Sequence, residues 1–246
     1  MYGGFAKIYD GLMTDAPYDN WAAYINEFLS NWFKNKNGKP LVLDLACGTG
    51  NITIRLASFG YDLIGVDLSD DMLAEAQQKA YEKKYKILFL NQDMRELDLY
   101  GTIDAVVCVC DGINYIINEE ELLTVFKKVR LFLNPGGVFI FDMNTEYKFK
   151  EVFGDKSFED RSENGDSYVW ENSYDENTKI NKYNILFYEN GDDEPFQEVH
   201  YQKAYDIKII KNQLLEVGFS SVKTRNDYSS QEIRPESTRV VFIAAV

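Results

Sequence analysis

The 246-residue sequence predicts an α/β fold: a doubly wound, mostly parallel sheet with helices on both faces and an inserted antiparallel β subdomain. Short apolar runs alternate with helix-like segments up to Thr145, as in consecutive βαβ units. Residues 42–50 combine the first apolar run with a glycine-bearing turn, and sheets of this kind bind ligands at the carboxyl ends of their strands. After Thr145, aromatic-rich runs divided by turn residues predict the antiparallel insertion.

The N-terminal part of the chain alternates helices with short strands. Asn37-Gly38 ends the first amphipathic helix, and Ser69 can cap a later helix whose first turn contains Asp70 and Asp71. The alternation predicts right-handed crossovers between parallel strands. The predicted elements are a helix at 21–33, a strand within 42–50, a helix at 51–58, a strand at 61–66, a helix from Ser69 to about Lys84 and a strand at 87–90.

The rest of the chain opens with a strand at 103–110 that is apolar throughout, as expected for a parallel strand covered on both faces. Further on, Gly218 stops a helix. The later predicted elements are a helix at 119–132, a strand at 138–142, antiparallel strands at 168–174, 180–188 and 196–205 with turns at 175–177 and 189–193, a helix at 206–217, and strands at 219–225 and 239–245. The expected parts are a helical arm or lid at 1–37, a main domain at 38–147 and 202–246, and an insertion at 148–201 that covers the substrate site.

The turn after the first strand points to a nucleoside ligand. Gly48 and Gly50 lack Cβ atoms, so the backbone can come close to a bound molecule. Asp67 ends the second strand 19 positions after Gly48, where a carboxylate can accept hydrogen bonds from ribose hydroxyls. A dinucleotide fingerprint would have a glycine where Thr53 stands, and Asp44 adds negative charge near a pyrophosphate position. We therefore expect a ligand without phosphates.

Four segments resemble motifs of the class I S-adenosylmethionine-dependent methyltransferases. They are the first motif at 44–50, the ribose-binding acidic turn at 67–69, the adenine-binding turn at 92–94 and the substrate-facing fourth motif at 108–115. The likeness is good over roughly residues 40–145 and only general elsewhere. It implies a seven-stranded Rossmann-like sheet and S-adenosylmethionine as cofactor.

The resemblance also implies which residues contact the cofactor. Asp93 can instead be a helix-capping residue, Met72 can instead belong to the core, and Trp21 can instead belong to a helix packing face. Cys110 is expected to act through its backbone. The full cofactor-binding set is Tyr9, Trp21, Asp44, Ala46, Gly48, Gly50, Asp67, Leu68, Met72, Asp93, Met94 and Cys110.

The substrate-facing candidates are Asp111, Asn114, Tyr115 and His200. The first three follow the fourth strand, where the transferred methyl group should lie, although Asp111 can simply cap a turn and Tyr115 can be a core aromatic. His200, the one histidine, shares a strand face with Gln202, and this face meets either water or substrate. An imidazole near its ordinary pKa could accept a proton from an amine or hydroxyl acceptor. No zinc-type Cys/His spacing is present in the sequence, so no metal is expected.

The net charge of the chain limits the classes of molecule that it is expected to bind. The net charge of −14 disfavours nucleic acid, and residues 151–200 supply −10 of it. This acidic segment either favours a neutral or cationic acceptor or merely solvates exposed hairpins. The chain has no apolar run that could span a membrane, and its three cysteines are predicted to be reduced. We expect a cytoplasmic monomer or homodimer.

The predicted function is methyl transfer by in-line displacement to a small molecule, with an amine as one acceptor considered. Two alternatives stay open on the sequence. An NAD-dependent oxidoreductase is disfavoured by Thr53 and Asp44. A non-catalytic nucleoside-binding regulatory module is harder to exclude, because cofactor-site residues alone do not prove turnover.

Overall fold

The computed structural model describes residues 5–161, 165, 167–188 and 195–246. Its main sheet has seven strands in the order β10-β11-β5-β4-β1-β2-β3, with β1 to β5 parallel and β10 and β11 antiparallel to their neighbours. Chain order reverses between β1 and β4, which is where such sheets bind ligands. The strands are β1 (Leu41–Leu45), β2 (Asp62–Asp67), β3 (Leu88–Asn91), β4 (Ile103–Cys108), β5 (Leu133–Asn144), β10 (Ser221–Asn226) and β11 (Arg239–Ala245).

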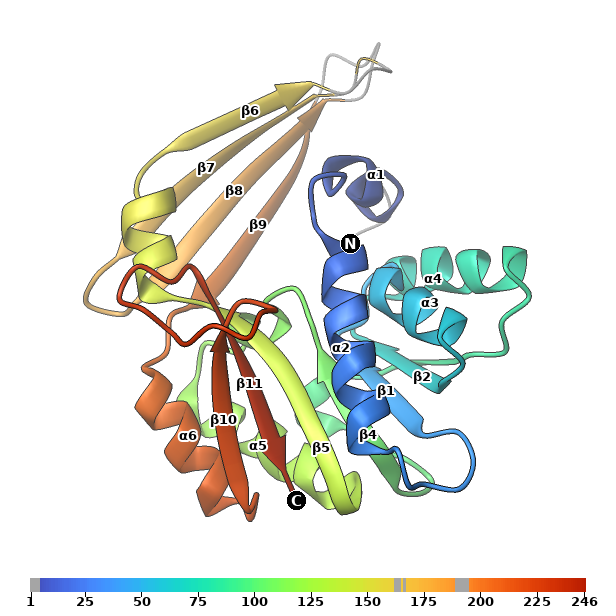
Figure 1. Cartoon of the computed structure of the whole chain (residues 1–246). Helices are drawn as coiled ribbons and strands as arrows, with labels where there is room; N and C mark the ends of the chain where they lie inside the picture. Colours follow the sequence, from blue (N-terminus) through green and yellow to red (C-terminus); the bar gives the residue numbers. More distant parts are fainter. Residues whose placement is uncertain (1–4, 162–164, 166, 189–194) are drawn as a thin grey trace.

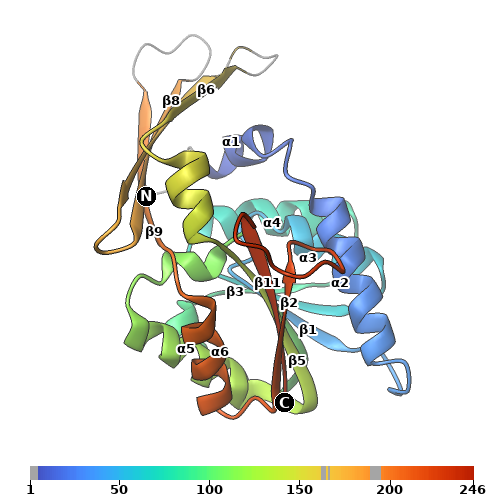
Figure 2. The ribbon, with the colours of Figure 1, turned by 60° about the vertical axis from the view of Figure 1, so that its left-hand side comes forward.

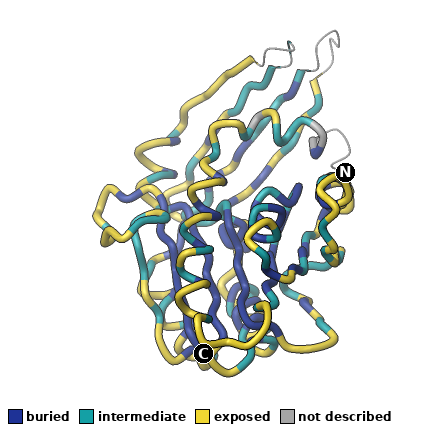
Figure 3. The backbone as a smooth tube through the Cα atoms, turned by 45° about the vertical axis from the view of Figure 1, so that its right-hand side comes forward, coloured by how far each residue is buried: buried dark blue, intermediate teal, exposed yellow. Residues whose placement is uncertain are grey.

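Helices cover both faces of this sheet (Figure 1). Successive residues of β1 point to opposite faces, so Val42 packs in one core with Ile25 of α2, and Leu43 packs in another with Phe126 of α5. Figure 3 shows that the buried residues gather in the strands of the main sheet. The helices are α1 (Phe5–Leu12), α2 (Tyr18–Trp32), α3 (Asn51–Ser58), α4 (Asp70–Glu82), α5 (Glu119–Phe132) and α6 (Ile207–Glu216).

A second, four-stranded sheet rises over one end of the main sheet, beside α1 (Figures 1 and 2). It is antiparallel throughout, in the order β6-β7-β8-β9. A short π-helix, η3 (Lys148–Phe153), leads into it from β5. Its strands are β6 (Ser157–Arg161), β7 (Ser167–Asp175), β8 (Ile180–Tyr188) and β9 (Phe196–Lys203). The predicted fold class, including the antiparallel insertion, is confirmed.

The structure differs from the sequence-based elements in several places: α1 was expected only as part of a helical arm, and α2 begins at Tyr18 rather than at residue 21. The fourth strand ends at Cys108 rather than at residue 110, because Cys110 and Asp111 both have left-handed backbone conformations (φ 64° and 54°). The fifth strand begins earlier, at Leu133. Strand β6 was not predicted, because all five of its residues are exposed and its sequence is largely charged, so it carries no apolar alternation.

The division of the chain into an arm, a main domain and an insertion at 148–201 stays a prediction, and the second sheet runs on to Lys203 of β9. The predicted turn at 175–177 lies between β7 and β8, whereas the whole of the predicted turn at 189–193 lies outside the described residues. In the part of the chain that the structure describes, no helix combines the length and apolar character needed to cross a membrane.

Candidate active site

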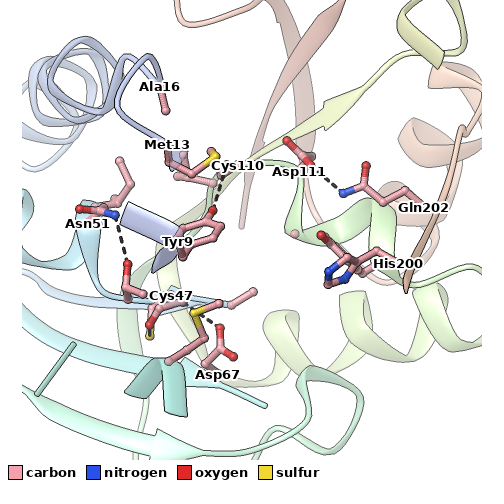
Figure 4. Close-up of a pocket in the computed structure, with 18 of the residues that line it drawn as sticks. Tyr9, Met13, Ala16, Cys47, Asn51, Asp67, Cys110, Asp111, His200 and Gln202 are labelled. Carbon is pink, nitrogen blue, oxygen red and sulfur yellow. Dashed lines mark hydrogen bonds between the residues drawn. The ribbon is translucent and has the colours of Figure 1, made fainter. Parts of the chain in front are cut away.

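A cavity of about 890 Å³ lies at the carboxyl ends of β1, β2 and β4 and reaches the second sheet. Figure 4 shows Asp67 and Cys47 at one side of it, Tyr9 near its middle, and Asp111, His200 and Gln202 at the other side. Every predicted cofactor-binding residue except Gly50 lines this cavity, and so do all the predicted substrate-facing residues except Asn114. We call the side near Asp67 the cofactor end and the side near Asp111 the acceptor end.

The turn after β1 fixes the position of Asp67. The Gly48 N–H donates to Asp67 Oδ2 at 2.7 Å, and the Ser69 N–H donates to Oδ1 at 2.9 Å. Each carboxylate oxygen keeps a further lone pair for a ligand hydroxyl. Gly48 has a left-handed φ of 53°, and a Cβ added there would meet nothing within 4 Å. The open space over Gly48 beside an oriented carboxylate fits the ribose and the adjoining chain of S-adenosylmethionine.

Asp44 lies behind this turn and is buried. Its Oδ2 accepts a hydrogen bond from Thr53 Oγ1 at 2.5 Å. Burial raises the pKa of Asp44 to about 7, although the Thr53 hydrogen bond opposes the shift. Thr53 therefore replaces the third glycine of a dinucleotide fingerprint with a hydroxyl that holds Asp44, which accords with the proposed role of Asp44 in orienting the turn.

Gly50 does not line the cavity, contrary to its predicted place in the contact set. A Cβ at Gly50 would lie 2.9 Å from the Cβ of Ala76 in α4, and its φ is 78°. Glycine is required here because the turn is left-handed and α4 packs against it. Gly50 therefore sets the shape of the turn after β1 without lining the cavity.

The predicted adenine pocket is formed by Met72, Met94, Leu68 and Asp93, all of which line the cavity. Met72 is buried against Ala6 and the second sheet. The Asp93 carboxylate accepts hydrogen bonds from the Arg95 N–H at 2.8 Å and from Arg95 Nε at 2.9 Å, and these bonds lower its pKa. Asp93 therefore caps the short helix η1 (Met94–Glu96), which was the alternative interpretation of this residue.

The N-terminal arm reaches the cavity through Tyr9. The Tyr9 hydroxyl lies 3.5 Å from that of Tyr18 and 4.0 Å from Cys110 Sγ. Next to it, Asp10 accepts hydrogen bonds from Thr49 Oγ1 at 2.7 Å and Asn51 Nδ2 at 2.8 Å. Asp10 also pairs with Lys79 of α4. These contacts hold α1 against the turn after β1 and against α4.

Trp21 satisfies both interpretations of its position. Its indole lines the cavity and belongs to the buried stripe of α2. The Arg239 guanidinium lies over this ring, 4.9 Å from its centroid, as in a cation–π contact. The tryptophan thus connects the helical arm to the charged group at the acceptor end.

All three cysteines are free thiols, as predicted. Burial raises the pKa of Cys110 to about 12, and the nearby Asp111 carboxylate adds to the shift. The thiol stays protonated near neutral pH, so thiolate chemistry is disfavoured and the expected contact through the Cys110 backbone remains the better prediction.

Asp111 is held in place by two donors from distant parts of the chain. Its Oδ1 accepts from Arg239 Nη2 at 3.0 Å, and its Oδ2 accepts from Gln202 Nε2 at 2.7 Å. Burial is the largest single influence and would raise the pKa of Asp111, but the charges of Arg239 and Lys148 and the hydrogen bonds from Gln202 and Arg239 together outweigh it, so the net shift is downward. The carboxylate is therefore ionised at neutral pH and is a weak proton acceptor.

Asn114 faces away from the cavity and is completely buried. Its Nδ2 donates to the carbonyl oxygens of Lys203 at 2.8 Å and Asn144 at 3.2 Å, and its Oδ1 accepts from the Asn144 N–H at 2.9 Å. These bonds tie β5 to the end of β9. The prediction that Asn114 faces substrate does not agree with this position, because the main chain of two strands occupies its whole amide.

His200 lies on the cavity wall rather than on a solvated strand face. The ring of Tyr115, which is 47% exposed, meets it edge to face with centroids 5.8 Å apart. Burial lowers the pKa of His200 below its ordinary value, so the imidazole is neutral at neutral pH. Both residues reach the acceptor end, as predicted; their roles there stay predictions.

Sequence reasoning missed Arg239 and Lys148, which line the acceptor end, and noted Gln202 only as a neighbour of His200 on its strand. An arginine at the start of the otherwise apolar strand β11 was the one available signal, because a charge there needs a partner. Nothing in the sequence around Lys148 distinguishes it from other surface lysines.

Comparison with known proteins agrees with this geometry. Residues 42–137 match the family described as "Methyltransferase domain". The chain is 38% identical to the "Putative methyltransferase YqeM" of Bacillus subtilis (strain 168), over 99% of this chain and 96% of that protein. The crystal structure of an S-adenosylmethionine-dependent methyltransferase from Clostridium acetobutylicum ATCC 824 superposes with a TM-score of 0.87 at 31% identity and covers 100% of this chain and 98% of that one. The glycine/sarcosine N-methyltransferase of Aphanothece halophytica is 27% identical over 92% of this chain and 82% of its own length.

The oriented carboxylate and the open turn beside a large cavity fit an enzyme that binds a nucleoside cofactor. The chain belongs to the S-adenosylmethionine-dependent methyltransferases. This membership sets aside the oxidoreductase and the non-catalytic module that the sequence had left open.

Proposed function

We propose that the chain transfers the methyl group of S-adenosylmethionine to the amine nitrogen of a small molecule. The observation that carries this proposal is the lining of the acceptor end, where Trp170, Tyr183 and His200 of the second sheet face the cavity. The volume of about 890 Å³ falls within the range of small-molecule sites, about 300–1,000 Å³, and the cofactor takes up part of it. What remains suits a small acceptor better than a macromolecule.

The cofactor end would hold the nucleoside through the residues already oriented there. Asp67 would accept the two ribose hydroxyls, the turn at Gly48 would allow close approach, and Met72 with Met94 would enclose the adenine. When bound, S-adenosylmethionine supplies a methyl group on a positively charged sulfur. The chain's task is then to align an acceptor lone pair with that carbon.

The charges at the acceptor end support an amine. Asp111 is ionised and keeps unused lone pairs, so it can attract and orient a neutral or cationic nitrogen group. The nitrogen lone pair forms the new N–C bond as the S–C bond breaks, and the nitrogen loses one proton. Neutral His200, or water in the cavity, would receive this proton. The likeness to a glycine/sarcosine N-methyltransferase supports the same acceptor chemistry.

A screen of acceptors tests the proposal. S-adenosylhomocysteine release is measured with matched primary amines, alcohols and phenols, for the wild type and for Asp67→Ala as a cofactor-site control. We expect turnover with amines, which falls in the control. Turnover with hydroxyl acceptors and none with amines would contradict the proposal.

A further inference from the structure

Among the residues that the structure describes, one cation at the acceptor end of the cavity has no carboxylate partner. Within the described residues, the lysine and arginine side chains that line the cavity are Arg95, Lys148 and Arg239. Arg95 pairs with Asp93 and Glu121, and Arg239 pairs with Asp111 and Asp142. For Lys148, the described part of the chain offers no carboxylate oxygen within 4.0 Å of Nζ. Its Nζ donates instead to the amide Oδ1 of Asn144 at 2.9 Å.

The surroundings of Lys148 destabilise its charged ammonium form, because no carboxylate offsets them. The side chain is half-buried, and its Nζ lies over the ring of Phe153, 5.1 Å from the centroid. Burial lowers the pKa of Lys148, the charge of Arg239 lowers it further, and Asp111 opposes the shift from a longer distance. A partly desolvated ammonium is stabilised when an anion pairs with it.

Carboxylates that could pair with a lysine are plentiful in this chain, which has 40 acidic residues against 26 basic ones. Two exposed lysines near the same region do have carboxylate partners, since Lys150 pairs with Glu176 and Lys179 pairs with Glu146, whereas Lys156 donates to the backbone carbonyls of Glu151 and Val152. The lysine inside the cavity therefore differs from its neighbours in having its ammonium available to a bound molecule.

The position of Lys148 indicates that an anion bound there would belong to the methyl acceptor rather than to the nucleoside cofactor. Lys148 begins η3, just after the carboxyl end of β5, and it interacts electrostatically with Asp111 and Cys110 at the tip of β4. Asp67, which marks the cofactor end, is not among the groups that affect the pKa of Lys148 most strongly. An anion on Lys148 would therefore lie near Asp111, on the side of the cavity where Figure 4 shows His200 and Gln202.

We propose that Lys148 binds an oxyanion of the methyl acceptor, so that the acceptor is an amine that also carries a carboxylate or an equivalent anionic oxygen group. The inference rests on the proposed amine methylation and adds the second functional group of the substrate. Such a molecule pairs its nitrogen with Asp111 and its anion with Lys148. As a zwitterion it has little net charge, in line with the neutral acceptor expected from the acidic sequence.

The test uses Lys148→Met, the charge-preserving Lys148→Arg, and Lys150→Met as a control from the exposed side of the same segment. The acceptors are glycine, aminomethylphosphonic acid and glycinamide, which share an aminomethyl group and differ in the anion. Lys148→Met should lower kcat/KM for glycine or for the phosphonate by about tenfold to a hundredfold, mainly through KM. Glycinamide turnover should not change, Lys148→Arg should recover most of the loss, and Lys150→Met should behave as the wild type. The preferred anion tells carboxylate from phosphonate.

Two further measurements keep the inference separate from the proposed function. Calorimetry gives the affinity for S-adenosylhomocysteine, which also carries a carboxylate; a loss of affinity in Lys148→Met would assign Lys148 to the cofactor and overturn the inference.

In the second measurement, binding of acetate and of methylphosphonate to the S-adenosylhomocysteine complex is followed by NMR. If the wild type methylates none of the amines, the proposed function fails, and binding alone decides: anion binding by the wild type that is absent in Lys148→Met supports the subsite, whereas equal or absent binding in both overturns it. An equal loss of glycinamide turnover would also overturn it.

Discussion

The two ends of the cavity are held together in different ways. At the cofactor end, the bonds that fix the site join residues close in sequence: Gly48 to Asp67 across 19 positions and Asp44 to Thr53 across 9. At the acceptor end, Asp111 bonds to Gln202 across 91 positions and to Arg239 across 128. The first end forms within two consecutive βα units, whereas the second exists only when β9 and β11 have reached their places. The part of the cofactor end that orients Asp67 is thus a local structure, whereas the acceptor end depends on the whole fold.

The largest effect that tests this difference should come from Arg239→Met. The change leaves the completely buried Asp142 and the neighbouring Asp111 without their cation. We expect the free energy of unfolding, measured by urea denaturation, to fall by about 3–5 kcal/mol, because an unpaired buried carboxylate is strongly unfavourable. Arg234→Met, at an exposed site before the same strand, should change it by less than about 0.5 kcal/mol.

The loss of stability in Arg239→Met should depend on pH in a defined direction. In the wild type the pKa of Asp111 is lowered, so its contribution to stability is present above its unfolded pKa of about 3.9 and is lost only as pH falls through the lower folded value. In Arg239→Met the buried carboxylates gain by protonation, so the difference between the two proteins should shrink as pH falls. A difference that does not vary with pH would contradict the role given to this ion pair.

At the cofactor end, Asp67→Ala should weaken binding of S-adenosylhomocysteine about a hundredfold, since hydrogen bonds to a charged acceptor are lost from both hydroxyls. Calorimetry measures the affinity, and Asp62→Ala at the exposed start of β2 is the control. The unfolding free energy should fall less than in Arg239→Met, because no buried charge is left unpaired. An affinity equal to that of Asp62→Ala would remove Asp67 from the cofactor site.

The same contrast explains what could be predicted from the sequence. The turn at 42–50 and Asp67 were found because local spacing alone fixes their geometry, and the parallel strands were found because buried strands are apolar throughout. Gly50 was placed in the contact set because glycine has two uses, close approach to a ligand and close packing of a helix, and the sequence does not tell them apart.

The acceptor end was predicted less completely. His200 and Gln202 share a face of β9 by simple alternation, but which way that face points depends on how the second sheet stands over the main sheet. Asn114 follows the fourth strand as a substrate-binding residue would, yet its side chain turns toward the backbone of Asn144 and Lys203, which no local pattern reveals. Arg239 and Lys148 enter the site only through tertiary packing.

The arm connects the two ends, and Asp10→Ala tests how far it retains the cofactor. Burial favours a raised pKa for Asp10, but its bonds to Lys79, Thr49 and Asn51 lower it, so the carboxylate stays charged throughout the neutral range. We expect dissociation of S-adenosylhomocysteine, measured by stopped flow, to become faster by about fivefold at most, because the group is partly exposed. Glu27→Ala on the exposed side of α2 should leave the rate unchanged. A rate that does not change in Asp10→Ala would mean that the arm does not hold the cofactor.

The smallest effect should come from His200→Ala at the acceptor end. The acceptor nitrogen must lose its proton before it attacks, so His200 changes the fraction of reactive acceptor rather than the barrier itself, and kcat/KM near neutral pH should fall by about threefold. Because burial lowers the pKa of His200, the wild-type rate should fall only below about pH 6.5, where the imidazole becomes protonated. In the variant this step should vanish, and the rate should instead follow the ionisation of the amine from a higher pH. Tyr201→Ala, on the exposed face of the same strand, should keep the wild-type profile. Identical profiles for all three proteins would assign the proton to water alone.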